Sequence, residues 1–182
     1  MKLPIVISCL LLSSLFAQSQ DSSERSIRVS VAEQKLYLVE DGETMKQYPV
    51  STSAYGIGSE AGSNKTPLGK HQVISKFGDG APLGTIFQSR INTGRVAKIY
   101  TDDTDLEEDD VTTRILRLTG LEPGKNKGSG IDSFARYIYI HGTPEEGLIG
   151  KPASHGCIRM KNADVVELYN LVGEGTLVMI ER

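Results

Sequence analysis

The sequence has 182 residues, of which 38% are hydrophobic, and its 20 basic and 23 acidic side chains give a formal net charge of −3. This length supports one hydrophobic core and is short for two, so the composition predicts a single globular domain. The slight acidic excess argues against nucleic acid as a partner, because phosphate binding needs a surplus of Lys and Arg.

Residues 1–19 have the pattern of a secretory signal peptide. Lys2 supplies a positive charge, Leu3 to Phe16 is an apolar run, and Ala17 begins a stretch of small residues at the spacing of a cleavage site. The run is shorter than the ~20 residues that a membrane-spanning helix needs, so an uncleaved anchor is the second interpretation. The sequence thus predicts an exported protein of the periplasm or cell wall, which contacts the membrane only if this segment stays uncleaved.

Cleavage would leave one cysteine in the mature chain. The sequence has two, Cys9 and Cys157, and Cys9 lies inside the predicted signal peptide. Cys157 would then have no intramolecular partner in a compartment where disulfides are stable. Such a thiol is either a small buried apolar side chain or a nucleophile, and its neighbours have to decide between the two.

Short segments rich in β-branched and aromatic residues alternate with Gly, Pro and Asp clusters, which is the pattern of many short strands. An Asp-Gly pair at 41–42 predicts a two-residue hairpin turn, because both positions tolerate positive φ. One helix is expected, with Asn162 as its N-cap and an apolar stripe that ends before Gly173. We therefore expect a mainly β fold with one or two short helices. The expected strands are Ile27 to Val31, Lys35 to Glu40, Thr44 to Ser51, His71 to Ser75, Ile115 to Leu118, Tyr137 to Ile140 and Thr176 to Ile180.

The longer loops are candidates for different roles. Residues 53–69 and 77–84 contain glycines and are expected to form the walls of a substrate cleft. Residues 102–110 hold seven of the 23 acids but lack the Gly and the alternation of a calcium loop, which predicts a solvated surface loop. His71 follows the first of these loops on an expected strand and is predicted to be a partly buried structural residue.

The segment from 140 to 160, IHGTPEEGLIGKPASHGCIRM, holds two of the three histidines and Cys157. A thiol attacks as the thiolate, and a free cysteine with a pKa of ~8.5 is mostly protonated at neutral pH, so it needs a nearby imidazole. His141 follows an expected strand, where its side chain can face a cleft, and His155 lies two residues before the cysteine. Both are candidates for the base.

The residues on either side of the cysteine complete the pattern. Gly156 has no Cβ, so the backbone can turn tightly and point N–H groups at a carbonyl oxygen, as an oxyanion hole requires. If residues 157–159 are extended, Arg159 shares a face with the sulfur and is suited to hold a substrate carboxylate in a two-pronged contact. The segment thus favours cysteine-dependent acyl transfer.

The motif IHGT followed by SHGCIRM resembles the L,D-transpeptidase catalytic domain, also called the YkuD domain. Further similarity lies in TPLG at 66–69, in RILRLTGLEPGKN and in DSFARYIYIHGT. The resemblance extends over residues 27–181, which we expect to form one catalytic domain. It implies a β-sandwich-like mixed sheet and an enzyme that acts on the stem peptides of peptidoglycan without a metal or another cofactor.

The resemblance also implies residue roles. Cys157 would attack the carbonyl between the third and fourth stem residues, expel the D-amino acid and form a thioester, which an amine from a second stem would convert into a 3→3 cross-link. His141 corresponds to the base, and the carbonyl of Gly142 would orient its imidazole. His155 and Gly156 would contribute to the oxyanion hole. Ser154 and Arg159 would contact the substrate and the loop.

Several alternatives remain at this point. Water could replace the amine, which would make the protein an L,D-carboxypeptidase, or the amine could belong to a lysine of an outer-membrane protein. A non-catalytic wall-binding module is the alternative from another class, although His141 and Cys157 are both present. His155 could instead be a residue that shapes the loop. The two histidines and Cys157 could also be three zinc ligands, but the segment lacks the acidic general base and the usual spacing.

Overall fold

The computed structural model describes residues 25–182, so the predicted signal peptide at 1–19 lies outside the described residues. The first strands are β1 (Arg25–Ser30), β2 (Lys35–Glu40), β3 (Glu43–Ser51), β4 (Gly69–Phe77) and β5 (Thr85–Gln88). They are followed by β6 (Ile91–Val96), β7 (Val111–Gly120), β8 (Tyr139–Gly142), the 3-10 turn η1 (Glu146–Leu148), β9 (Ile158–Met160), α1 (Asn162–Leu171) and β10 (Leu177–Glu181).

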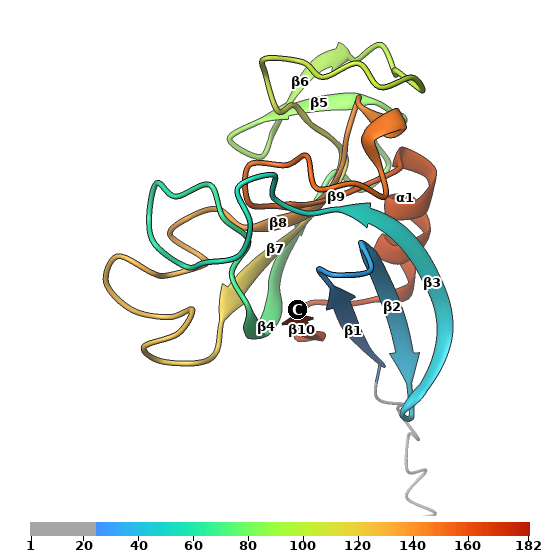
Figure 1. The fold of residues 1–182 in the computed structure, drawn as a ribbon. Helices are drawn as coiled ribbons and strands as arrows, with labels where there is room; N and C mark the ends of the chain where they lie inside the picture. Colours follow the sequence, from blue (N-terminus) through green and yellow to red (C-terminus); the bar gives the residue numbers. More distant parts are fainter. Residues whose placement is uncertain (1–24) are drawn as a thin grey trace, which may run out of the picture.

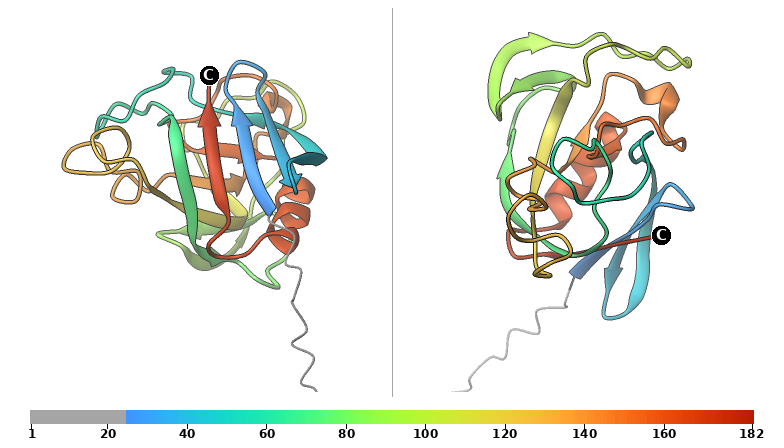
Figure 2. Two further views of the ribbon diagram at one scale, coloured as in Figure 1. Left: turned by 90° about the horizontal axis from the view of Figure 1, so that it is seen from below. Right: turned by 60° about the vertical axis from the view of Figure 1, so that its left-hand side comes forward.

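All ten strands belong to one mixed sheet in the order β4-β10-β1-β2-β3-β9-β8-β7-β5-β6. An additional pairing of β4 with β7 closes the sheet into a barrel-like ring, and β5 and β6 extend beyond β7 at the top of Figure 1. Figure 2 shows β4, β10, β1 and β2 side by side in the view from below. The predicted mainly β fold with a mixed sheet and few helices is confirmed.

Two tight hairpins fix the register of neighbouring strands. The turn between β2 and β3 has φ of 52° at Asp41 and 84° at Gly42, which confirms the predicted hairpin. The turn between β5 and β6 is formed by Ser89 and Arg90, with φ of 49° and 70°. Neither residue is a glycine, so this second turn carries backbone strain.

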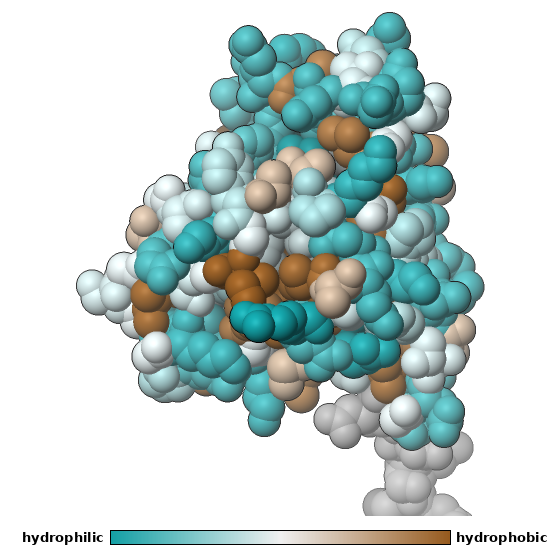
Figure 3. All heavy atoms as spheres, in the orientation of Figure 1, coloured by the Kyte–Doolittle hydropathy of each residue, from teal (hydrophilic) through white to brown (hydrophobic). Residues whose placement is uncertain are grey.

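Strands β8 and β9 separate the main core from a second apolar cluster. Ile140 and Ile158 pair with each other and are fully buried in the main core. The alternate residue Tyr139 packs instead with Phe87 and Ile115 in the second cluster. The face of β8 and β9 that turns away from the main core is therefore available to form a site. The face of the molecule in Figure 3 is mostly polar around a small apolar area near its middle.

The helix α1 packs Val165, Leu168 and Tyr169 into the main core, as its apolar stripe predicted. The prediction that Asn162 caps this helix is wrong. Lys161 occupies the N-cap position, and the Asn162 side chain is buried, where its amide donates to the Thr143 carbonyl at 2.8 Å. Asn162 therefore ties the start of the helix to β8. No helix of residues 25–182 has both the length and the apolar character to cross a membrane.

His71 on β4 is fully buried rather than partly buried. Its Nδ1 lies 2.9 Å from the Gly69 carbonyl oxygen and its Nε2 lies 3.0 Å from Ser133 Oγ. Burial is the main cause that lowers the pKa of His71 to about 4. This histidine is a neutral structural residue at physiological pH.

Acid should therefore destabilise the protein through His71. The unfolded chain binds a proton near pH 6.5 and the folded chain only near 4, so the free energy of unfolding should fall across this window by about 3 kcal/mol. Urea unfolding at pH 7, 5.5 and 4 measures this fall. His71→Gln should show a smaller pH slope than wild type. Equal slopes in the two proteins would contradict the assignment.

Candidate active site

Parallel pairing of β8 and β9 brings the two parts of the histidine and cysteine motif together. His141 pairs with Arg159, and Cys157 directly precedes β9 on the same face as Arg159. The backbone N–H of Tyr139 donates to Cys157 Sγ at 3.3 Å. His141 was predicted to follow a strand, but it lies within β8, because pairing with β7 and β9 continues through Gly142.

The environment of the Cys157 thiol keeps it protonated at rest. Burial, followed by the negative charge of Asp109, raises its pKa to about 12, although the N–H of Tyr139 acts in the opposite direction. The thiol donates to the Tyr137 carbonyl oxygen at 3.4 Å. If Cys157 acts as a nucleophile at neutral pH, a base has to remove its proton during attack.

His141 has the properties of such a base. Its side chain is buried, and burial is the main cause that lowers its pKa, so the imidazole is neutral at physiological pH. Its Nδ1 lies 2.7 Å from the Gly142 carbonyl oxygen, which fixes the proton on Nδ1 and leaves Nε2 as an acceptor. A Cβ on Gly142 would lie 2.6 Å from Asn162 Oδ1, so this position has room only for glycine.

The loop that carries Cys157 is held by hydrogen bonds from both sides. Ser154 is buried, and its hydroxyl donates to the Cys157 carbonyl at 2.6 Å. Gly156 has a φ of +119° and donates its N–H to Ser154 Oγ at 3.3 Å. Thr66, from the loop at 53–69, donates to the Gly156 carbonyl at 3.1 Å. In this structure Ser154 therefore supports the loop, and the predicted cleft-wall loop packs directly behind the cysteine.

His155 points away from the buried part of the site. Its side chain is 41% exposed, its ring lies against Tyr55, and Asp109 Oδ2 accepts its backbone N–H at 3.2 Å. The same carboxylate oxygen lies 3.2 Å from His155 Nδ1. These contacts place His155 as a residue that shapes the loop.

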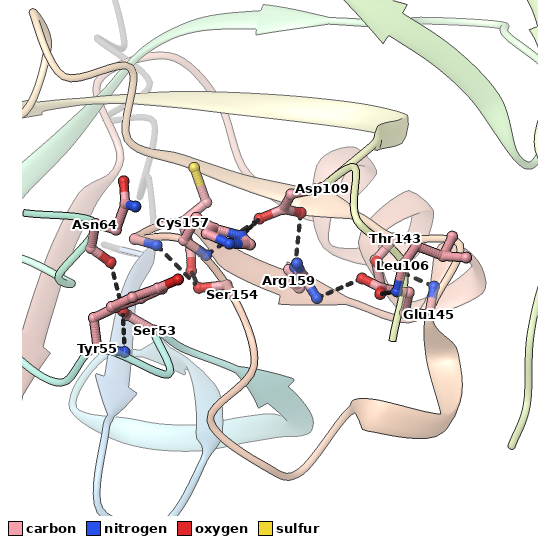
Figure 4. A network of polar contacts seen from close by, with 12 residues as sticks. Ser53, Tyr55, Asn64, Leu106, Asp109, Thr143, Glu145, Ser154, Cys157 and Arg159 are labelled. Atoms are coloured by element: carbon pink, nitrogen blue, oxygen red, sulfur yellow. Dashed lines mark hydrogen bonds and ion pairs between the residues drawn. The ribbon is translucent and has the colours of Figure 1, made fainter. Parts of the chain in front are cut away.

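Arg159 is placed differently from the expected two-pronged substrate contact. Its side chain is 1% exposed, with Nε 2.8 Å from Asp109 Oδ1 and Nη1 2.6 Å from Glu145 Oε2. Figure 4 shows Arg159 between these two carboxylates, with the Cys157 sulfur pointing away from them. The guanidinium thus neutralises buried acids of the protein and does not present a free fork to the solvent.

Asp109 and Glu145 were not predicted from the sequence. The run at 102–110 was expected to be a solvated loop, but Asp109 reaches Arg159, and the Leu106 N–H donates to Glu145 Oε1 at 2.6 Å. Burial acts to raise the pKa of Asp109, but His141 and Arg159 outweigh it and the net shift is downward. The available signal was Arg159 itself, since an arginine placed beside a buried strand requires a carboxylate partner.

A cavity of about 330 Å³ lies over the second apolar cluster. Cys157 packs against this cluster, as do Phe77 and Ala81 of the loop that was predicted to form the second cleft wall. Cys157 does not itself line the cavity, but Tyr137 and Tyr139, whose backbone groups contact its sulfur, do. Within residues 25–182 no group of three His, Cys, Asp or Glu side chains is arranged to hold a metal ion.

Comparison with known proteins decides the family. A family model described as the L,D-transpeptidase catalytic domain, YkuD, matches residues 24–180. The chain belongs to this family. Among curated L,D-transpeptidase relatives, Bacillus subtilis YkuD is 48% identical over 61 residues, which are 33% of this chain and 37% of YkuD. Bacillus subtilis YqjB is 51% identical over 45 residues, which are 25% of this chain and 26% of YqjB.

Solved L,D-transpeptidases share the fold. One from Mycobacterium smegmatis has a TM-score of 0.55 at 18% identity, with 88% of this chain and 59% of that chain covered. L,D-transpeptidase 3 from Mycobacterium tuberculosis, in complex with a faropenem-derived adduct, has a TM-score of 0.55 at 20% identity, covering 88% and 61%. The matched region is thus well under half of the curated relatives and about three fifths of these structures.

Proposed function

We propose that this protein is an L,D-transpeptidase that acts on peptidoglycan stem peptides through a thioester on Cys157. One observation carries the proposal. His141 lies in β8, and Cys157 directly precedes β9, the parallel partner of β8, on the same face. The Gly142 carbonyl holds the imidazole with Nε2 free to accept a proton. The family assignment supports the substrate class.

The geometry suggests the sequence of steps. His141 Nε2 takes the proton from Cys157 as Sγ attacks the scissile carbonyl carbon. The amide C–N bond then breaks, and the protonated imidazole returns the proton to the departing amine of the D-residue. An acceptor amine attacks the thioester carbonyl and loses its proton to His141. The C–S bond then breaks, and the protonated imidazole returns this proton to the departing thiolate.

The oxyanion donors would come from the loop at 154–157. The Gly156 N–H bonds to Ser154 Oγ at 3.3 Å, a long contact that a substrate oxygen can replace. In this mechanism Arg159 acts through Asp109 and the loop and does not touch the substrate.

Muropeptide mass spectrometry tests the reaction. Incubation with purified tetrapeptide stems should release the fourth residue and produce 3→3 cross-linked dimers. Trimmed tripeptides without dimers would instead assign the L,D-carboxypeptidase reaction. Intact stems would contradict the proposal and favour a wall-binding module. We also propose that the protein is exported, in which case the mature chain should begin shortly after Ala17 and contain one thiol, as measured by intact mass.

A further inference from the structure

One charged side chain of the cavity beside Cys157 takes no part in the proposed mechanism. The cavity is lined by apolar and aromatic residues, by Ser89 and by Arg90. Arg90 is the one charged residue among those that line it, and no acid does. A hollow of about 330 Å³ is large enough to hold one or two residues of a peptide.

The Arg90 guanidinium is held in place but is not neutralised. Its Nη1 donates to the Tyr139 hydroxyl at 3.0 Å, and its centre lies 5.4 Å from the centre of the Tyr137 ring. Within residues 25–182 no carboxylate forms an ion pair with Arg90. A guanidinium has five N–H donors, so most of them remain for a ligand.

The strained turn that carries Arg90 also indicates a functional role. Ser89 and Arg90 form the two-residue turn between β5 and β6, and both have positive φ. Such a turn favours Asn-Gly, and strain of this kind at non-glycine residues is concentrated at functional sites. The turn places Arg90 on the wall of the cavity.

Tyr139 connects this arginine to the nucleophile. Its backbone N–H donates to Cys157 Sγ at 3.3 Å, and its hydroxyl accepts from Arg90 at 3.0 Å. One residue, Tyr139, therefore contacts the thiol with its backbone and the guanidinium with its side chain. A substrate that extends from Cys157 along Tyr139 into the cavity can present a group to Arg90.

We propose that Arg90 binds a carboxylate of the acyl donor, so that the site selects donors with a free carboxylate near the scissile carbonyl. Arginine is suited to this role because its planar fork matches a carboxylate. The inference rests on the proposed function. A stem peptide offers two such groups, namely the terminal carboxylate of the leaving D-residue and the side-chain carboxylate of a diamino acid at the third position.

The test compares three synthetic tetrapeptide donors, one with both carboxylates free, one amidated at the third side chain and one amidated at the C-terminus. Wild type, Arg90→Gln, Arg90→Lys and Arg95→Gln are each assayed for release of the fourth residue. Arg95 is exposed on the same hairpin and does not line the cavity, so its variant is the matched control. Alkylation of Cys157 by iodoacetamide at equal rates in all four proteins verifies that the thiol and its surroundings are intact.

Arg90→Gln should lower kcat/KM for the free donor by about 10- to 100-fold, mainly through KM, because one charge-assisted contact is lost. Arg90→Lys should fall in between, and Arg95→Gln should match wild type. The amidated donor whose kcat/KM is the same with wild type and Arg90→Gln identifies the carboxylate that Arg90 binds. If Arg90→Gln lowers kcat/KM for both amidated donors as much as for the free donor, the inference is wrong while the proposed function stands. The same holds if Arg90→Gln behaves like wild type with all three donors. If wild type releases nothing from any donor, the proposed function fails and this inference with it.

Discussion

Replacement of Cys157 by Ala is expected to abolish covalent labelling. A penem incubated with wild type should give one stable adduct by intact mass, and peptide digestion should place it on Cys157, whereas Cys157→Ala should give none. Cys157→Ser should be nearly inert, because a hydroxyl is far less acidic than a thiol and the base must remove its proton fully during attack. A labelled Cys157→Ala protein, or continued release of a D-residue from stems by that variant, would contradict the mechanism.

His141→Ala should label slowly, since loss of a general base typically costs ~10² to 10⁴ in rate. The pH dependence gives an independent check. Burial lowers the pKa of His141, so the imidazole stays neutral below pH 6.5 and the rate should fall only when the pH drops through this lowered pKa. His155→Ala is the matched control, and the exposure of His155 predicts a much smaller effect. An equal loss in both variants would remove His141 from its role.

The barrel-like sheet could be predicted in part because most of its strands have a clear apolar pattern. β6 was missed because its sequence, INTGRV, is largely polar and almost wholly exposed. β5 was missed because it has only four residues, although three of them are buried. β9 was missed because it has three residues, although its extended backbone was the condition for placing Arg159 beside the sulfur. Short or polar strands of this kind are stabilised by pairing with neighbours, which local sequence does not encode.

The candidate site could be predicted where its residues lie within one segment and not where distant segments meet. Cys157 and His141 stand out as candidates because a thiol and imidazoles are rare in this chain. The partners of Arg159 could not, since Asp109 belongs to an acidic run that looks solvated and only tertiary folding brings it back to β9. Arg90 was not predicted either, because it lies on a hairpin that the sequence pattern did not reveal.

The buried charges around Arg159 should make its replacement costly to the fold. Arg159 and Glu145 are 1% and 0% exposed, and their atoms Nη1 and Oε2 lie 2.6 Å apart. Arg159→Met would leave Glu145 and Asp109 without their cation, and the loss of one partner of a buried pair typically costs about 3–5 kcal/mol. Urea unfolding at pH 7 measures this loss.

Two further variants separate charge from packing. Arg159→Lys keeps the cation but cannot reach both carboxylates, so it should lose less stability than Arg159→Met. The double variant Arg159→Met/Glu145→Leu should recover part of the loss, because the deep carboxylate is removed together with its partner. Burial already raises the pKa of Glu145, so acidification should protonate it. The difference in the free energy of unfolding between Arg159→Met and wild type should then become smaller. If this difference stays constant from pH 7 to pH 5 and the double variant recovers no stability, packing rather than charge explains the loss.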